Sequence, residues 1–216
     1  MLNQKITLAI STSAGQFAVI LGDEDKNILY NSTKTSQSQE LDDLLKAGLE
    51  KIGRVAQDIS EIIIDVGPGG TSRVRTGIAF ANALAYSLNI AVCPVKSSQI
   101  ACLDIFLEYS MPSIFSVKSI KDNAYIAFHD RNNISDIRFG KINEIVPEFV
   151  KDIKEFVVIG AHRDEIINLE SLKNYVIHDS GKLFGNAEIL IKNIELFNKE
   201  KLIFPNFAQA VTEECL

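Results

Sequence analysis

Cysteine and histidine are scarce in this sequence, and their spacing excludes several kinds of site. The 216 residues include three cysteines, Cys93, Cys102 and Cys215, and three histidines. The cysteines are too few and too irregularly spaced for a disulfide framework or a zinc site, which fits a reducing compartment. No two histidines stand at the i, i+4 spacing of a helical metal site. We therefore expect no bound metal ion, and we assign the histidines to surface loops.

Positive charge and long apolar runs are also lacking. The chain has 22 Lys and Arg against 28 Asp and Glu, a net charge of −6. A protein that binds nucleic acid without a partner usually carries a basic patch. Any role with nucleic acid is therefore expected to be shared with a more basic partner. The longest apolar stretch, 78–88, falls short of the ~20 residues of a membrane helix. Only a short apolar run follows Lys5, so we expect no signal peptide, no membrane contact and a cytoplasmic location.

The order of the expected elements repeats along the chain. Apolar periodicity and turn residues define them. In the first half they are strands at 6–10, 17–21 and 27–31, a helix at 38–53, a strand at 61–66, a helix at 71–88, a strand at 91–95 and a helix at 97–107. The second half also runs from three strands to helix, strand and helix. We therefore predict two α/β lobes with mixed sheets, residues 1–108 and 109–216.

A glycine-rich loop lies between the buried strand 61–66 and the long helix. Its glycines permit a close backbone approach and positive φ, and free N–H groups at a helix N-terminus favour an anion. A candidate nucleotide or anion loop therefore comprises Gly67, Pro68, Gly69, Gly70, Thr71 and Arg75. The alternative is a tight structural turn, because neither a Walker motif nor G-x-G-x-x-G is present.

The helix 71–88 carries small residues on more than one face, including Ala79, Ala81 and Ala83. A helix that is apolar all round must be covered on every side. The cover is either the leucine-rich helix before it or a second chain. The candidate interface comprises Leu41, Leu45, Leu49, Ile78, Ala81, Asn82 and Ala85. Ala81→Glu should abolish association if Ala81 faces outward, and should unfold the protein if Ala81 belongs to the core.

Four motifs in residues 5–105 resemble the TsaB (YeaZ) family. The family's I-L-A-I-D-T-S strand corresponds to TLAISTS at 7–13, and its H-S-Q-x-L helix start to QSQEL at 37–41. Its G-P-G-S-F-T-G-x-R-x-G loop corresponds to GPGGTSRVRTG at 67–77, and V-x-S-x-x-A to VKSSQIA at 95–101. The second half matches only in length and element order, with a weak echo of a terminal P-x-Y-x-R at 205–209.

The sequence departs from the family pattern at several positions. Ser11 replaces an Asp, Gln37 a His and Gln209 an Arg, and residues 70–73 replace Ser-Phe-Thr-Gly. The change at position 11 removes the carboxylate that enzymes of the ASKHA (actin-like ATPase, ribonuclease H-like) fold use near their metal. The resemblance implies this two-lobed fold with no catalytic residue and no cofactor.

The resemblance also implies a function. TsaB-like proteins are non-catalytic partners of the TsaD transferase, which acts with a TsaE-like ATPase to place threonylcarbamoyl on adenosine 37 of tRNA. The chain would meet tRNA only through this complex, and two copies would form a homodimer when the partner is absent.

Two other functions are weighed against this one. An ASKHA-type nucleotide-binding phosphotransferase would need the carboxylate that is missing at Ser11. A glycoprotease-type metallopeptidase would need closely spaced metal ligands that the three histidines do not supply.

Overall fold

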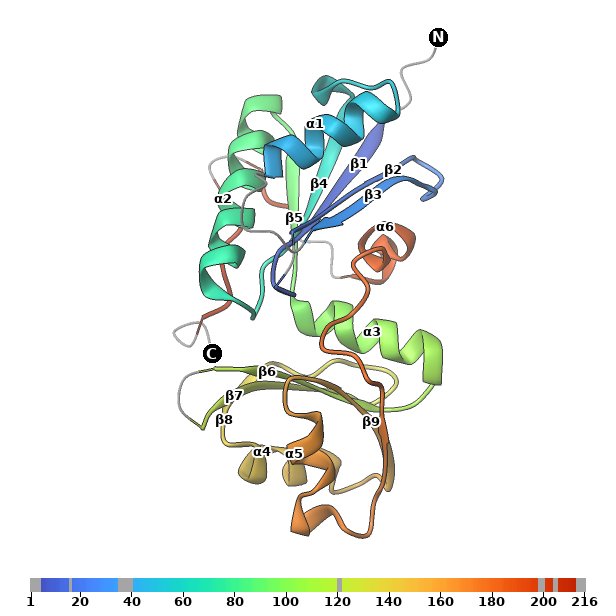
Figure 1. Cartoon of the computed structure of the whole chain (residues 1–216), viewed down its shortest axis with the longest axis vertical. Coiled ribbons are helices and arrows are strands. Elements are labelled where there is room, and N and C mark those ends of the chain that lie inside the picture. The colour runs from blue at the N-terminus through green and yellow to red at the C-terminus, as the bar shows by residue number, and fades with distance from the viewer. Residues whose placement is uncertain are drawn as a thin grey trace. The chain divides into compact units, whose positions relative to one another are not determined.

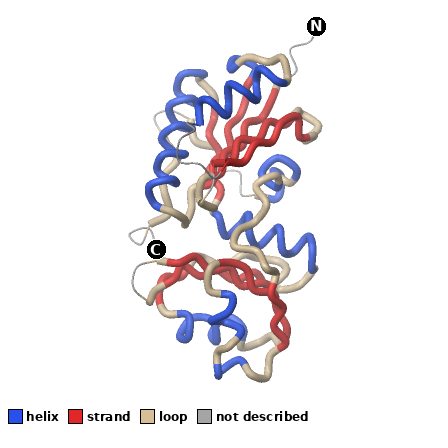
Figure 2. Tube along the Cα trace, in the orientation of Figure 1, coloured by secondary structure: helices blue, strands red, loops and turns tan. Residues whose placement is uncertain are grey.

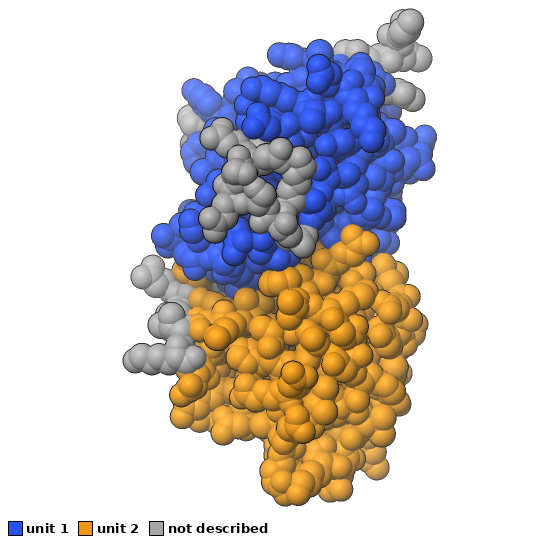
Figure 3. Space-filling model, in the orientation of Figure 1, with its two compact units in different colours: residues 1–97, 187–211 blue, residues 98–186, 212–216 orange. Residues whose placement is uncertain are grey.

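The computed structural model describes residues 5–15, 17–34, 41–119, 122–197, 201–203 and 206–212. The chain forms two compact units, residues 1–97 with 187–211 and residues 98–186 with 212–216 (Figure 3). Each unit is built around one five-stranded mixed sheet with helices packed against it (Figures 1 and 2).

The elements follow the predicted order closely. The first unit contains β1 (Ile6–Ser11), β2 (Phe17–Gly22), β3 (Ile28–Lys34), α1 (Leu41–Lys51), η1 (Ala56–Asp58), β4 (Ile59–Asp65), α2 (Thr71–Leu88), β5 (Ala91–Val95), α6 (Ile189–Lys192) and η3 (Ile194–Leu196). The second contains α3 (Ser97–Tyr109, except its first residue), β6 (Ser113–Lys118), β7 (Ala124–His129), β8 (Arg138–Gly140), α4 (Ile142–Val150), β9 (Glu155–Gly160), α5 (Arg163–Ile167), η2 (Glu170–Leu172) and β10 (Val176–Asp179).

The first sheet has the strand order β3-β2-β1-β4-β5. Strands β1, β4 and β5 are parallel to one another, and β2 pairs antiparallel with both β1 and β3. Strand β4 contains a β-branched run, Ile62–Ile64, that is buried on both faces. Ile62 and Ile64 belong to the core beneath α1 and α2, whereas Ile63, which is also fully buried, faces the opposite side. This burial explains why these three consecutive residues are all apolar.

Helix α1 buries one leucine-rich face and ends at a glycine. Within the described residues it begins at Leu41, and residues 38–40 of the predicted helix lie outside them. Gly53 has φ +67°, a left-handed conformation that glycine adopts without strain. This turn lets the Arg54 N–H donate to the Leu49 carbonyl at 2.9 Å, which closes the helix.

The second sheet repeats this arrangement with the order β10-β9-β6-β7-β8. Its first three strands are antiparallel, and β9 and β10 extend it in parallel from β6. Alternate residues face opposite layers. Phe115 packs with α3 on one face, and Ile114 packs with α4 and α5 on the other. The two matching mixed sheets confirm the predicted α/β class and the two-lobed ASKHA-type fold.

The compact units differ from the predicted division into 1–108 and 109–216 at two segments. Residues 98–109 of α3 belong to the second unit, because Ala101, Cys102 and Ile105 pack on its sheet. Residues 187–211 return to the first unit, where α6 contacts β1 and β2. Among the described residues, no helix has the length and apolarity to cross a membrane.

Candidate functional site

The first sheet has a switch point between β1 and β4. These strands are parallel neighbours, and the chain continues from β1 to one side of the sheet and from β4 to the other. In open α/β sheets, ligands bind in the crevice at the carboxyl ends of the strands at such a point. Residues 11–13, at the end of β1, and the glycine-rich loop, which follows β4, both lie at this end. The predicted loop is therefore at the position where a site would be expected.

Asp65, the last residue of β4, is the central group of this crevice. Its side chain is buried, with 1% of the residue exposed. The Ser11 hydroxyl donates to Oδ2 at 2.8 Å, and the Ser13 hydroxyl donates to the same oxygen. Oδ1 accepts from the Ser97 hydroxyl at 2.6 Å and from the Gly67 N–H at 3.0 Å. We call these five residues the Asp65 cluster. A carboxylate has about four acceptor positions, and four donors occupy them here.

The sequence did not reveal this cluster. It indicates a missing carboxylate, because Ser11 stands where the resembling family has Asp. Position 11 carries no carboxylate, but the Asp65 carboxylate lies one strand away and contacts the Ser11 hydroxyl directly. The sequence contained two signs of the cluster: an Asp at the end of an apolar strand and hydroxyl residues after β1. Nothing in the sequence indicates that these residues, 54 positions apart, contact each other.

The glycines of the loop are explained by contacts within the chain. A Cβ at Gly69 would lie 2.5 Å from the Ser13 Cβ and 2.7 Å from its backbone, so the loop packs directly on the residues that follow β1. A Cβ at Gly77 would lie 2.6 Å from Thr12 Oγ1. This brings α2 close to β1. The Thr12 hydroxyl is fully buried and has no hydrogen-bond partner among the described residues.

The two arginines of the loop motif have different environments. Arg73 Nη1 donates to the Gly15 carbonyl at 2.7 Å, and the guanidinium lies against Gly70. It therefore ties α2 to the turn between β1 and β2. Arg75 and Thr71 are exposed, and no side chain caps the first turn of α2. The predicted loop residues are thus gathered at the start of α2, from buried Gly67 and Pro68 to these exposed side chains.

The predicted interface side chains lie mostly in the core of the first unit. Six of the seven are buried in one hydrophobic cluster, with exposed fractions from 0% for Ala81 to 7% for Leu49. They are Leu41, Leu45, Leu49, Ile78, Ala81 and Ala85. The seventh is Asn82, whose side-chain amide bonds with the backbone of Ala208. The leucine helix, the sheet and the chain's own C-terminal segment therefore cover these residues in the single chain.

A different face of α2 is exposed. It is lined mainly by small residues, at helical spacing. They are Ser72, Thr76, Ala79, Ala83 and Ser87. The Thr76 and Ser87 hydroxyls donate to carbonyls of the helix itself, so they bind their own backbone. We call this surface the small-residue face of α2.

The C-terminal segment is held against α2 and β5. Leu202 forms an antiparallel bridge with Val92, and the Val211 N–H donates to the Val66 carbonyl at 2.9 Å. Of the motif echo at 205–209, Pro205 lies outside the described residues, and Gln209 is exposed. Gln37 also lies outside the described residues.

A family model described as TsaD, tRNA N6-adenosine threonylcarbamoyltransferase, matches residues 28–178, which are 151 of the 216 residues. The chain belongs to the TsaD family. This membership gives it a role in the threonylcarbamoyl modification of tRNA. No curated protein matches the sequence significantly.

Two solved structures show that this TsaD-family chain has the YeaZ (TsaB) fold. One is "an uncharacterized protein with similarity to peptidase YEAZ from Pseudomonas aeruginosa", with a TM-score of 0.78 and 16% identity over 96% of this chain and 99% of that one. The other is YeaZ from Pseudomonas aeruginosa, with a TM-score of 0.73 and 16% identity over 90% and 95%. The predicted resemblance is confirmed in the fold, and the chain is a divergent member of the TsaD family.

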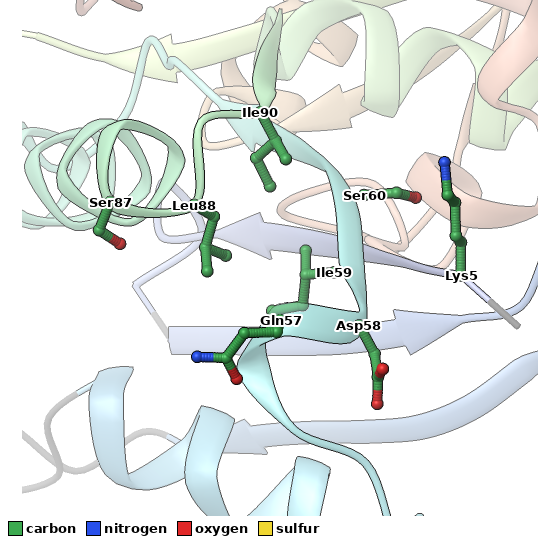
Figure 4. Close-up of a pocket in the computed structure, with 8 residues that line it drawn as sticks. All are labelled: Lys5, Gln57, Asp58, Ile59, Ser60, Ser87, Leu88 and Ile90. Atoms are coloured by element: carbon green, nitrogen blue, oxygen red, sulfur yellow. The ribbon is translucent and has the colours of Figure 1, made fainter. Parts of the chain in front are cut away.

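A hollow of this TsaD-family chain lies at the other end of the first sheet. It is an open cavity of about 430 Å³ (Figure 4). It is lined by Lys5, Gln57, Asp58, Ile59, Ser60, Ser87, Leu88 and Ile90. Two of its polar groups already bond to backbone, Ser60 to the Ile6 carbonyl and Asp58 to the Val55 N–H. Because ligands of such sheets bind at the carboxyl ends of the strands, we place the candidate site at the Asp65 cluster instead.

Within the described part of the chain, no three His, Cys, Asp or Glu side chains are grouped to hold a metal ion.

Proposed function

We propose that this chain is a non-catalytic partner of a TsaD-like transferase, which places threonylcarbamoyl on adenosine 37 of tRNA. The observation that carries the proposal is the small-residue face of α2, on a TsaD-family chain with the YeaZ fold. Small side chains let a second helix approach closely, so that ridges and grooves interdigitate. This face therefore suits a helix of a partner protein.

The state of Asp65 supports a non-catalytic role. Four donors already bind its carboxylate. A general base or a metal ligand needs a free lone pair directed at the proton or ion. Asp65 has none to offer without losing one of these bonds. The transferase partner would then supply the reacting groups.

The charge of the chain supports a shared complex. A net charge of −6 opposes direct binding of the phosphate backbone. In the proposed assembly the TsaD-like partner carries most of the tRNA contact, and a TsaE-like ATPase completes the complex. When the partner is absent, the small-residue face joins two copies of this chain.

Reconstitution tests the catalytic part of this proposal. Purified chain, TsaD-like partner, TsaE-like ATPase, tRNA and threonylcarbamoyl-adenylate are combined, and the modified nucleoside is measured by mass spectrometry. We expect no product from this chain alone, and product from the complete mixture that falls strongly when the chain is left out. Product formed by the chain alone, or formed equally fast without it, would contradict the proposal.

Two variants and a matched control test the interface. Ala79→Glu and Ala83→Glu place a charge on the small-residue face, and Val55→Glu places one at a residue that is 58% exposed outside α1 and α2. We expect the first two variants to lose association with the TsaD-like partner, measured by size exclusion with light scattering, and Val55→Glu to retain it. Retained binding in all three variants would place the interface elsewhere.

A further inference from the structure

Actin-like folds imply a nucleotide, so the fit of a phosphate at the switch-point crevice of the first sheet can be tested on its residues. A phosphate needs free donors and the absence of nearby negative charge. Here the Gly67 N–H and the hydroxyls of Ser11 and Ser97 already donate to the Asp65 carboxylate. A phosphate placed at the Asp65 cluster would therefore meet a buried carboxylate whose four donors are already engaged. The residues present do not fit the group.

Space in the crevice is also taken. The backbone of Gly69 packs so closely on Ser13 that a single Cβ would clash. Arg73, the nearest guanidinium, holds the Gly15 carbonyl. The turn after β1, which would have to open toward a phosphate, is thus covered by the loop and bonded to α2.

The equivalent end of the second sheet also carries close backbone contacts. There β6 and β9 are the parallel neighbours at the switch point. Gly160, the last residue of β9, packs against the Ser116 carbonyl, so that a Cβ there would clash with it. The Ala161 N–H donates to this carbonyl at 2.9 Å, and the His162 N–H donates to the Ser116 hydroxyl at 3.2 Å.

We infer that the switch-point crevice of the first sheet is closed by the chain itself, and that the Asp65 cluster is a structural lock at the place where the fold implies a nucleotide phosphate. The lock joins the end of β1, the end of β4, the start of α3 and the loop that leads into α2. This inference concerns the first unit alone and does not depend on the proposed partner.

The first experiment measures stability. Asp65→Asn keeps the shape of the side chain but replaces one acceptor oxygen with an NH₂ donor, so some of the four donors lose their partner. Because hydrogen bonds to a charged group contribute more than neutral ones, we expect the melting temperature to fall by about 10 °C. The matched control is Asp25→Asn, at an exposed turn residue, which should stay within about 2 °C of the wild type. A melting temperature of Asp65→Asn equal to that of the control would overturn the inference.

Smaller perturbations keep the test decisive if Asp65→Asn does not fold. Ser11→Ala and Ser13→Ala each remove one donor to the carboxylate and should lower the melting temperature by several degrees. Unchanged stability in both would show that the cluster is no lock.

The second experiment measures nucleotide binding by the full-length wild type and Gly69→Ala. With ATP and Mg²⁺ up to the millimolar range, we expect no saturable heat in titration calorimetry and no rise in the melting temperature of the wild type. Gly69→Ala should be strongly destabilised, because its Cβ collides with Ser13. Saturable ATP binding to the wild type that Gly69→Ala weakens at unchanged stability would identify a ligand loop and refute the lock.

Discussion

The sharpest prediction compares two alanines of α2 that lie two positions apart. A helix turns by about 100° per residue, so residues 79 and 81 point roughly 200° apart. Ala81 is 0% exposed and belongs to the core cluster, whereas Ala79 is exposed. Glu at position 81 overpacks the core, which costs about 1–3 kcal/mol. It also buries an unpaired charge, which costs several kcal/mol more.

These costs together, about 4–8 kcal/mol, approach the whole stability of an ordinary domain, about 5–15 kcal/mol. We therefore expect Ala81→Glu to unfold the first unit or to lower its melting temperature by more than about 10 °C. Ala79→Glu should change the free energy of unfolding by no more than about 0.5 kcal/mol.

Calorimetry and urea unfolding followed by circular dichroism measure both variants under the same conditions. A melting temperature of Ala81→Glu within about 2 °C of the wild type would refute its placement in the core. It would also mean that Ala81 can contact a partner.

Three further predictions concern single side chains. Burial raises the pKa of the Cys102 thiol to about 12, so this cysteine should resist alkylation at pH 8 in the native protein and react in urea, as peptide mapping by mass spectrometry will show. His129 is buried at the end of β7 and not in a surface loop as expected, and this burial lowers the pKa of its imidazole below the usual 6.5. The unfolded state then binds more protons as pH falls below that value, so the free energy of unfolding should decrease from pH 7 to pH 5, and His129→Gln should flatten this decrease in urea titrations. Asn82→Ala removes both side-chain bonds to the Ala208 backbone. It should cost about 1–3 kcal/mol and speed proteolysis of the C-terminal segment, and cleavage at the wild-type rate would count against this attachment.

The sequence predicted elements and their order well, because periodicity records which faces are buried. The run at 61–66 contains three consecutive isoleucines, and β4 is indeed buried on both faces there. In α2 the same reasoning fails. Alanine fits equally well in a core and on a surface, so its position in the sequence does not tell which of Ala79 and Ala81 is buried. Contacts with other elements, such as the packing of Gly77 on Thr12, decide which face of α2 is buried.

The sequence predicted where the glycine-rich loop lies but not which groups fill the crevice beside it. The glycine pattern located the loop after β4, because glycine marks close backbone approach. The group that fills the crevice, Asp65, is a single polar residue at a strand end, and its donors Ser11 and Ser97 lie 54 and 32 positions away. No local pattern connects residues so far apart, since a hydrogen bond between side chains has no sequence period.

The return of the chain to the first unit sets the order in which the protein can be completed during synthesis. All strands of the second sheet come from the continuous stretch 113–179, whereas the first unit needs Leu202 on the β5 edge and Val211 on Val66. At about 5–20 residues per second, the roughly 110 residues from the end of β5 to Leu202 take about 5–20 s to emerge. For that time the β5 edge lacks its Leu202 contact, and an open strand edge can pair with another chain. Nascent chains halted before residue 201 should therefore protect the second unit from protease while the first stays sensitive.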